Sequence, residues 1–98
     1  MTHRRVVVTG LGCVTPVGNT VSTAWANLLA GRSGITTITR FDASGISSQI
    51  AGEVKNFEID KYVNSKEART MDTFIHYGLA AAQEAAQDAG LPSGDALT

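Results

Sequence analysis

The chain has 98 residues, a formal net charge of −1 and a hydrophobic share of 43%. A chain of this length forms one domain at most, its balanced charge offers no basic field to hold a nucleic acid, and its single cysteine excludes an internal disulfide. No apolar run approaches the roughly 18 residues of a membrane span, and the N-terminus lacks a signal-peptide h-region, so we expect a cytoplasmic protein without a membrane or nucleic-acid partner.

The chain opens on an apolar run that predicts a buried strand. Val6, Val7 and Val8 are consecutive and β-branched, which is typical of an inner strand in a parallel sheet covered on both faces. We therefore predict a strand over residues 4–10, followed by a glycine-punctuated turn over 11–19.

A first amphipathic helix is predicted to run to about Ala30, with Thr20 or Asn19 as its N-cap and Gly31 just beyond its end. Its apolar residues recur at helical spacing and form one stripe, made of Val21, Ala24, Trp25, Leu28 and Leu29.

The middle of the chain is predicted to be less regular. Residues 31–48 are rich in small polar residues and indicate an ordered excursion, and residues 49–54 indicate a short strand. Phe57, Ile59 and Tyr62 are spaced for a helical turn, and Asn64 with Glu67 resembles a capping box.

The second clear helix is predicted from its N-cap Asp72 to Gly90, with Pro92 behind it. One stripe is built mostly of small residues and should allow close packing against a neighbour: Ile75, Gly78, Leu79, Ala82, Ala85, Ala86 and Ala89. Gln83, Glu84, Gln87 and Asp88 lie largely on the other side. The element order indicates an α/β fold, and two strands alone do not make a stable parallel sheet, so we expect residues 1–98 to be an incomplete unit.

Gly10-Leu11-Gly12 after the predicted strand is similar to part of a dinucleotide-binding loop. The position of the third glycine holds Thr15, and residues 32–40 contain no acidic partner for a ribose. A tight structural turn is the favoured interpretation, with a small nucleotide-binding domain as a weaker alternative.

Cys13 is the one candidate thiol nucleophile, but neither His3 nor His76 stands at a recognisable spacing from it. We interpret Cys13 as a small, buried residue and His76 as an exposed or interface residue. Nothing in the chain predicts a catalytic, cofactor or metal site. Lys61, Lys66 and Arg69 form a small basic group, which indicates either a solvated surface or a docking patch for an acidic protein.

Several stretches together resemble the N-terminal part of a type II β-ketoacyl-acyl-carrier-protein synthase. They lie in the same order at residues 4–12, 15–19, 29–35, 41–42, 51–54, 71–78 and 88–91. The resemblance implies a thiolase-like fold, five-layered α-β-α-β-α in the complete family chain, of which residues 1–98 form an incomplete N-terminal half. It also implies a homodimeric enzyme that needs no cofactor and condenses an acyl thioester with malonyl-acyl-carrier protein.

The family's catalytic cysteine and two histidines match no position of this chain, so the resemblance implies that the chain alone is inactive. Lys66 and Arg69 match the basic character of the family's carrier-protein docking surface, whereas Ser65 and Thr70 stand where relatives often carry further basic residues. The implied partners are acyl carrier protein and the rest of a synthase chain. The alternative is a small non-catalytic α/β binding or interaction module.

Overall fold

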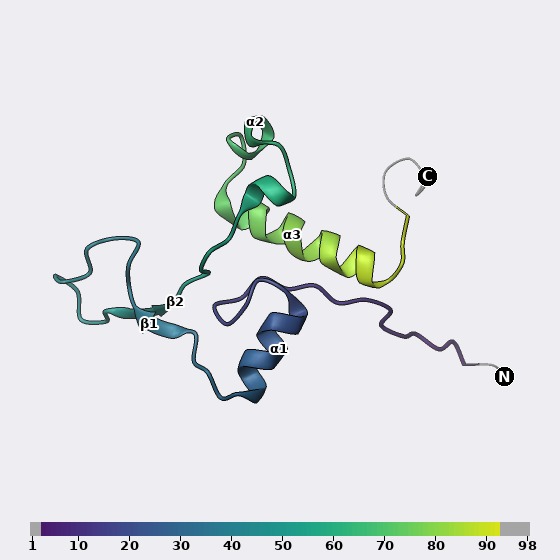
Figure 1. Ribbon diagram of the computed structural model, residues 1–98, viewed down its shortest axis with the longest axis horizontal. Coiled ribbons are helices and arrows are strands. Elements are labelled where there is room, and N and C mark those ends of the chain that lie inside the picture. The colour runs from purple at the N-terminus through teal and green to yellow at the C-terminus, as the bar shows by residue number, and fades with distance from the viewer. Residues whose placement is uncertain (1–2, 93–98) are drawn as a thin grey trace.

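A computed structural model describes residues 3–92 of the chain. Its elements are α1 (Val21–Leu29), β1 (Ile35–Thr37), β2 (Ile50–Gly52), the 3₁₀ turn η1 (Ile59–Lys61), α2 (Ser65–Ala68) and α3 (Thr73–Asp88). Figure 1 shows the β1–β2 hairpin projecting to one side, with α3 above and α1 below the extended N-terminal segment. The radius of gyration is 17.2 Å, whereas a compact domain of this length has about 13 Å. The elements are therefore spread out rather than folded around one centre.

The predicted helix ends are confirmed by their capping groups. The Thr20 side chain accepts a hydrogen bond from the Thr23 N–H at the start of α1, and the Asp72 side chain accepts one from the Thr73 N–H at the start of α3. Gly31 and Gly90 follow the two helices with φ of 71° and 72°. Only glycine adopts this left-handed conformation without steric cost, so both helices end where the sequence predicts.

Two shorter predictions are also confirmed. The predicted turn after Phe57 forms as η1, and its aromatic residues cluster: the rings of Phe57 and Tyr62 stack at 5.7 Å, and those of Phe57 and Tyr77 meet edge to face at 5.1 Å. The Asn64 side chain caps α2 by accepting a hydrogen bond from the Glu67 N–H at 2.8 Å.

The predicted strand over residues 4–10 is wrong for the described part of the chain, where this segment pairs with no other strand. Val6, Val7 and Val8 are 94%, 69% and 78% exposed. A strand is defined by its ladder of hydrogen bonds with a neighbour, and none of the described segments runs alongside these valines. β-propensity alone therefore leaves the segment extended and unpaired.

The sheet of the described residues is an antiparallel hairpin and not the expected parallel sheet. β1 pairs with β2 in a register that sets Ile35 opposite Gly52 and Thr37 opposite Ile50. The strand predicted at 49–54 is thus confirmed at its centre, whereas β1 lies in the region 31–48, which was predicted as an ordered excursion without a strand. The β-branched run of β1 becomes a strand because the following loop brings β2 back against it.

α3 packs closely on the extended segment through small residues. A side chain at Gly12 would collide with the Ala81 carbonyl oxygen, and one at Gly10 would collide with the Ala85 carbonyl oxygen and Ala89. α3 therefore packs closely on the Gly-x-Gly segment, but only part of the predicted stripe does so. Ala85 and Ala89 belong to that stripe and Ala81 does not, and a methyl group at Gly78 would meet nothing within 4 Å.

The apolar stripe predicted for α1 is largely exposed. Trp25, Leu28 and Leu29 are 60%, 57% and 71% exposed, and Ala24 is the one buried residue of this helix. The stripe of α3 is also exposed at its first residue, Ile75. The one buried residue of α3 is Ala80, which is not part of the predicted stripe. No described element covers these surfaces, and side chains bury only where another element packs on them.

Candidate functional site

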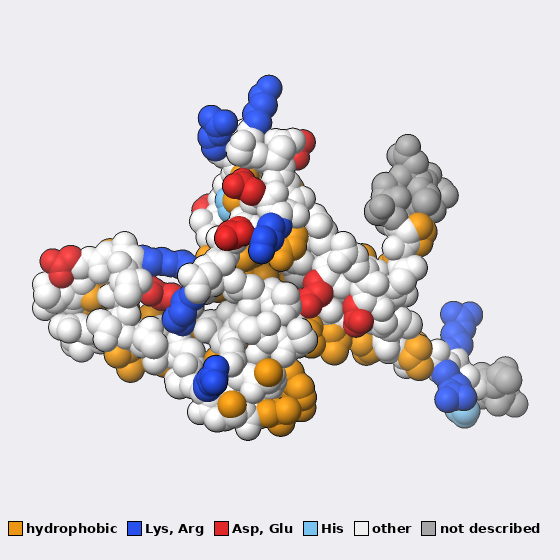
Figure 2. Space-filling view, in the orientation of Figure 1, with side chains coloured by type: hydrophobic (Ala, Val, Ile, Leu, Met, Phe, Trp, Pro, Cys, Tyr) orange, Lys and Arg blue, Asp and Glu red, His pale blue; other side chains and the backbone are white. Residues whose placement is uncertain are grey.

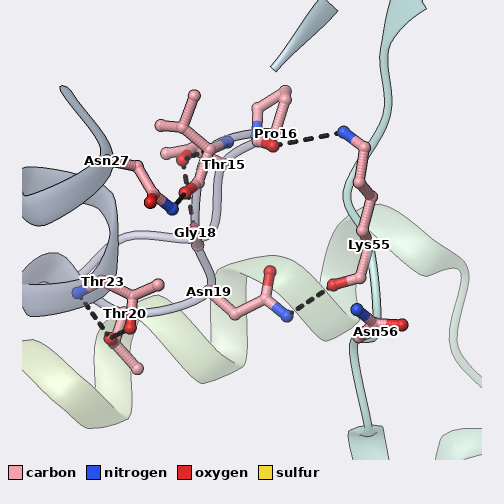
Figure 3. A pocket seen from close by; sticks show the side chains of 10 residues that line it. Thr15, Pro16, Gly18, Asn19, Thr20, Thr23, Asn27, Lys55 and Asn56 are labelled. Atoms are coloured by element: carbon pink, nitrogen blue, oxygen red, sulfur yellow. Dashed lines mark hydrogen bonds between the residues drawn. The ribbon is translucent and has the colours of Figure 1, made fainter. Parts of the chain in front are cut away.

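The turn after the Gly-x-Gly segment forms one wall of a cavity of about 370 Å³ (Figure 3). The turn is closed by two backbone hydrogen bonds, from the Thr15 N–H to the Gly18 carbonyl at 2.9 Å and from the Gly18 N–H to the Thr15 carbonyl at 3.1 Å. Pro16 at its corner fixes φ and favours this geometry. The start of α1 and residues 55–56 complete the cavity.

Lys55 ties this turn to two other segments. Its ammonium donates to the carbonyl oxygens of Pro16 and Gly34, both at 3.2 Å, and of Glu53 at 2.9 Å. The Asn19 side chain donates in turn to the Lys55 carbonyl at 2.8 Å (Figure 3). All three ammonium hydrogens have acceptors, so Lys55 holds segments together and is not a free cation for a ligand.

The cavity at the Thr15–Gly18 turn is built for structure and not for catalysis. Its side chains are threonines, asparagines, a proline, a valine and Lys55, and it contains no carboxylate, imidazole or thiol. Acid–base and nucleophilic catalysis both need a group that titrates or attacks near neutral pH. Nothing in this cavity supplies such a group.

Cys13 lies nearby on the Gly-x-Gly segment and is half-buried. Burial raises the pKa of its thiol, and the charge of the Glu84 carboxylate raises that pKa further. A nucleophilic cysteine needs the opposite shift, from a cation, a histidine or a helix N-terminus. The surroundings of Cys13 therefore keep it a neutral thiol.

The two histidines are not brought to Cys13. His3 is exposed in the extended N-terminal segment. His76 is half-buried, and its Nε2 lies 3.0 Å from the Ala68 carbonyl oxygen, which joins α3 to α2. His76 is thus an interface residue, one of the two predicted alternatives, because its ring joins α3 to α2.

Glu84 and Asp88 have a role that the sequence did not reveal. The half-buried Glu84 carboxylate accepts hydrogen bonds from the Cys13 N–H at 3.0 Å and from the Val21 N–H at 3.0 and 3.2 Å. One turn later, Asp88 accepts from the Leu11 N–H at 3.0 Å. The i, i+4 spacing of the two acids is visible in the sequence, but their positions on the predicted helix placed them on the side away from its packing stripe.

These bonds also decide against the dinucleotide-loop interpretation. In such a loop the backbone N–H groups after the strand are free to hold a pyrophosphate. Here the N–H groups of Leu11 and Cys13 already donate to carboxylates. A phosphate at this place would meet two negative charges instead of two free donors.

Lys66 and Arg69, the predicted docking residues, lie on and just after α2 and are exposed. The Arg69 Nε donates to the Ser65 carbonyl at 3.3 Å, which holds the stem of the side chain against the helix. Figure 2 shows basic side chains standing clear of the surface over α2. The third predicted basic residue, Lys61, pairs with Glu58 at 3.4 Å and is partly neutralised.

Residues 3–92 bring no three histidine, cysteine or acidic side chains together in a way that could hold a metal ion. No helix within the same range is long and apolar enough to cross a bilayer.

Comparison with known proteins assigns the chain to a family. Residues 3–97 match the N-terminal domain of β-ketoacyl synthases. The chain is 53% identical over 91 residues to 3-oxoacyl-[acyl-carrier-protein] synthase 2 of Vibrio cholerae, which covers 93% of this chain and 22% of the relative. It is 48% identical over 93 residues to the enzyme of the same name from Staphylococcus aureus, covering 95% and 22%.

A solved structure, the ishigamide ketosynthase/chain length factor, superimposes with a TM-score of 0.83 at 41% identity, over 93% of this chain and 23% of that one. The chain thus spans about a fifth of the length of the relatives that it matches. The match over residues 3–97 and this superposition show that the chain belongs to the β-ketoacyl synthase family and carries part of its thiolase-like α/β fold.

Proposed function

We propose that this chain is the N-terminal part of a type II β-ketoacyl-acyl-carrier-protein synthase. The complete enzyme would elongate fatty acyl chains by decarboxylative condensation of an acyl thioester with malonyl-acyl-carrier protein. The observation that carries this proposal is the 53% identity over 91 residues to a 3-oxoacyl-[acyl-carrier-protein] synthase 2.

By itself, the chain is proposed to be inactive. Condensation needs a thiolate to hold the acyl group, and the neighbours of Cys13 raise its pKa. His76 is engaged with the Ala68 carbonyl on another helix. Within residues 3–92, therefore, no thiol is activated by an imidazole.

In the complete enzyme, this part of the chain is proposed to contribute to carrier-protein docking. Lys66 and Arg69 are exposed on one short helix, and Lys66 has no ion pair among the described residues. Unpaired basic side chains steer an acidic partner toward the surface and speed its encounter. We further propose a homodimeric, cytoplasmic enzyme, by analogy with the family.

A chimera tests this proposal directly. The first 91 matched residues of the Vibrio cholerae synthase are replaced by those of this chain, and condensation of acyl- and malonyl-carrier proteins is measured. We expect a folded chimera with condensation activity, and a folded but inactive chimera would contradict the proposal. The 98-residue chain is assayed beside it, and condensation or decarboxylation by this chain alone would refute its proposed inactivity.

The alternative, a free-standing interaction module, has less support. An autonomous module buries its large apolar side chains, whereas Val6, Trp25 and Leu29 are each at least 60% exposed. Denaturation separates the two possibilities, because a module unfolds cooperatively as an isolated chain. A sharp, reversible transition of the 98-residue chain would favour the module.

A further inference from the structure

A second cavity, of about 460 Å³, opens between the segment after β2 and the first turn of α3. Its polar side chains come from three separate segments and are those of Arg40, Asn56, Thr73, His76 and Tyr77. We propose that this cavity binds a phosphate group, with Arg40 as its principal ligand. This proposal concerns a different site from the docking surface and does not depend on the proposed condensation activity.

Arg40 is held in place from one side. Its Nη2 donates to the Val54 carbonyl at 2.7 Å and to the Tyr77 hydroxyl oxygen at 3.1 Å. Within residues 3–92, no carboxylate oxygen lies within 4.0 Å of its guanidinium. A guanidinium has five N–H donors in a planar fork, and two bonds from one nitrogen leave donors on Nε and Nη1. An oriented fork with unused donors matches the geometry of a phosphate.

The nearby carboxylates are engaged with other donors. Glu53 accepts from the Thr39 hydroxyl at 2.8 Å and from the Thr39 and Arg40 backbone N–H groups at 3.2–3.3 Å. The Asp72 carboxylate accepts from the Thr73 N–H at 2.8 Å. These acids weaken the positive field of the cavity without pairing with the guanidinium. We therefore expect affinity on the order of millimolar, and not micromolar.

Other groups of the wall complement Arg40. The Tyr77 hydroxyl accepts from Arg40, so its own hydrogen remains available to donate. The His76 Nε2 donates to the Ala68 carbonyl, because a carbonyl oxygen only accepts, and this bond fixes the ring in the cavity wall. Asn56 lies in the same wall and adopts φ of 57°, a left-handed conformation that asparagine tolerates better than most other non-glycine residues.

Titration of the chimeric synthase with inorganic phosphate, followed by NMR of its ¹⁵N-labelled arginine, histidine and tyrosine residues, tests the proposal, because the chimera completes the fold around these segments. We expect saturable shifts of the Arg40, His76 and Tyr77 signals, and Arg40→Gln should weaken binding roughly ten- to hundredfold because it removes a charge-assisted bond. Arg32→Gln is the matched control, since it removes the same charge from a residue that bonds Asn27 instead.

Several results of this titration would overturn the proposed phosphate site. The proposal is overturned by an absence of saturable shifts, by unchanged binding of Arg40→Gln, or by equal weakening in the Arg32→Gln control. Acetate that binds as tightly as phosphate would overturn the phosphate assignment. If Arg40→Gln loses helical signal in circular dichroism, Tyr77→Phe replaces it, because this variant keeps the ring and removes one donor. We expect a weakening of several-fold for Tyr77→Phe, and unchanged binding there would also refute the site.

Discussion

The contact between the Gly-x-Gly segment and α3 makes one sharp prediction about stability. In Gly12→Ala, the new methyl group would collide with the Ala81 carbonyl oxygen and lie 2.8 Å from the Ala85 nitrogen. Both are backbone atoms of a helix, so no side-chain rotation relieves the overlap. The segment or the helix must move apart.

Two contributions set the size of this effect. Overpacking of this kind costs about 1–3 kcal/mol. Displacing the segment also lengthens the 3.0 Å bond from the Cys13 N–H to Glu84, and a hydrogen bond to a charged group contributes about 1.5–3 kcal/mol, less where it is partly exposed. We expect Gly12→Ala to lower the free energy of unfolding by about 2–4 kcal/mol. The chimeric synthase is several times longer than this chain, and in a longer protein each kcal/mol shifts Tm by about 2–4 °C or less, so the fall in Tm should be at most roughly 15 °C.

The assay is thermal and urea denaturation of the chimeric synthase, which completes the fold around this segment. Gly78→Ala is the matched control on the same helix, because a methyl group there meets nothing within 4 Å. Gly78→Ala should raise stability by about 0.5–1 kcal/mol through helix propensity. A Gly12→Ala variant as stable as the parent would show that the close approach of these segments is not what the glycine provides.

The other predictions concern charge and titration. Because the pKa of Cys13 is raised, its alkylation by iodoacetamide should be slower at neutral pH than that of a free cysteine, and a faster rate would contradict the raised pKa. Hydrogen bonds from Thr39 lower the pKa of Glu53, so its stabilising effect is complete above the ordinary glutamate pKa and is lost as pH falls through the lowered one. Tm of Glu53→Gln should therefore fall less between pH 7 and acid than that of the parent, and an equal fall would exclude Glu53 as a source of the pH dependence. In the chimera, Lys66→Glu with Arg69→Glu should weaken carrier-protein binding about tenfold or more at low salt, while Lys61→Glu should change it less. Unchanged affinity of the double variant would remove both residues from the docking surface.

Local chemistry made the helices predictable. Thr20 and Asp72 accept N-terminal hydrogen bonds, and Gly31 and Gly90 take up a left-handed conformation that other residues avoid. These signals act over a few residues, so they are readable without knowing the rest of the fold. The family resemblance was equally readable, because its motifs extend along almost the whole chain, and the match over residues 3–97 confirms it.

What the sequence could not determine depends on which segments meet. Val6–Val8 have strand propensity, but propensity does not supply a neighbouring strand, and the valines remain exposed. Glu84 and Asp88 have the pattern of a solvated helix face, yet they bind the N–H groups of a segment more than sixty residues away. The sequence alone therefore determined the helix boundaries and the family. Only the tertiary structure decided the antiparallel hairpin, the carboxylates on the Gly-x-Gly segment and the Arg40 cavity, because each of these needs partners that lie far apart in the chain.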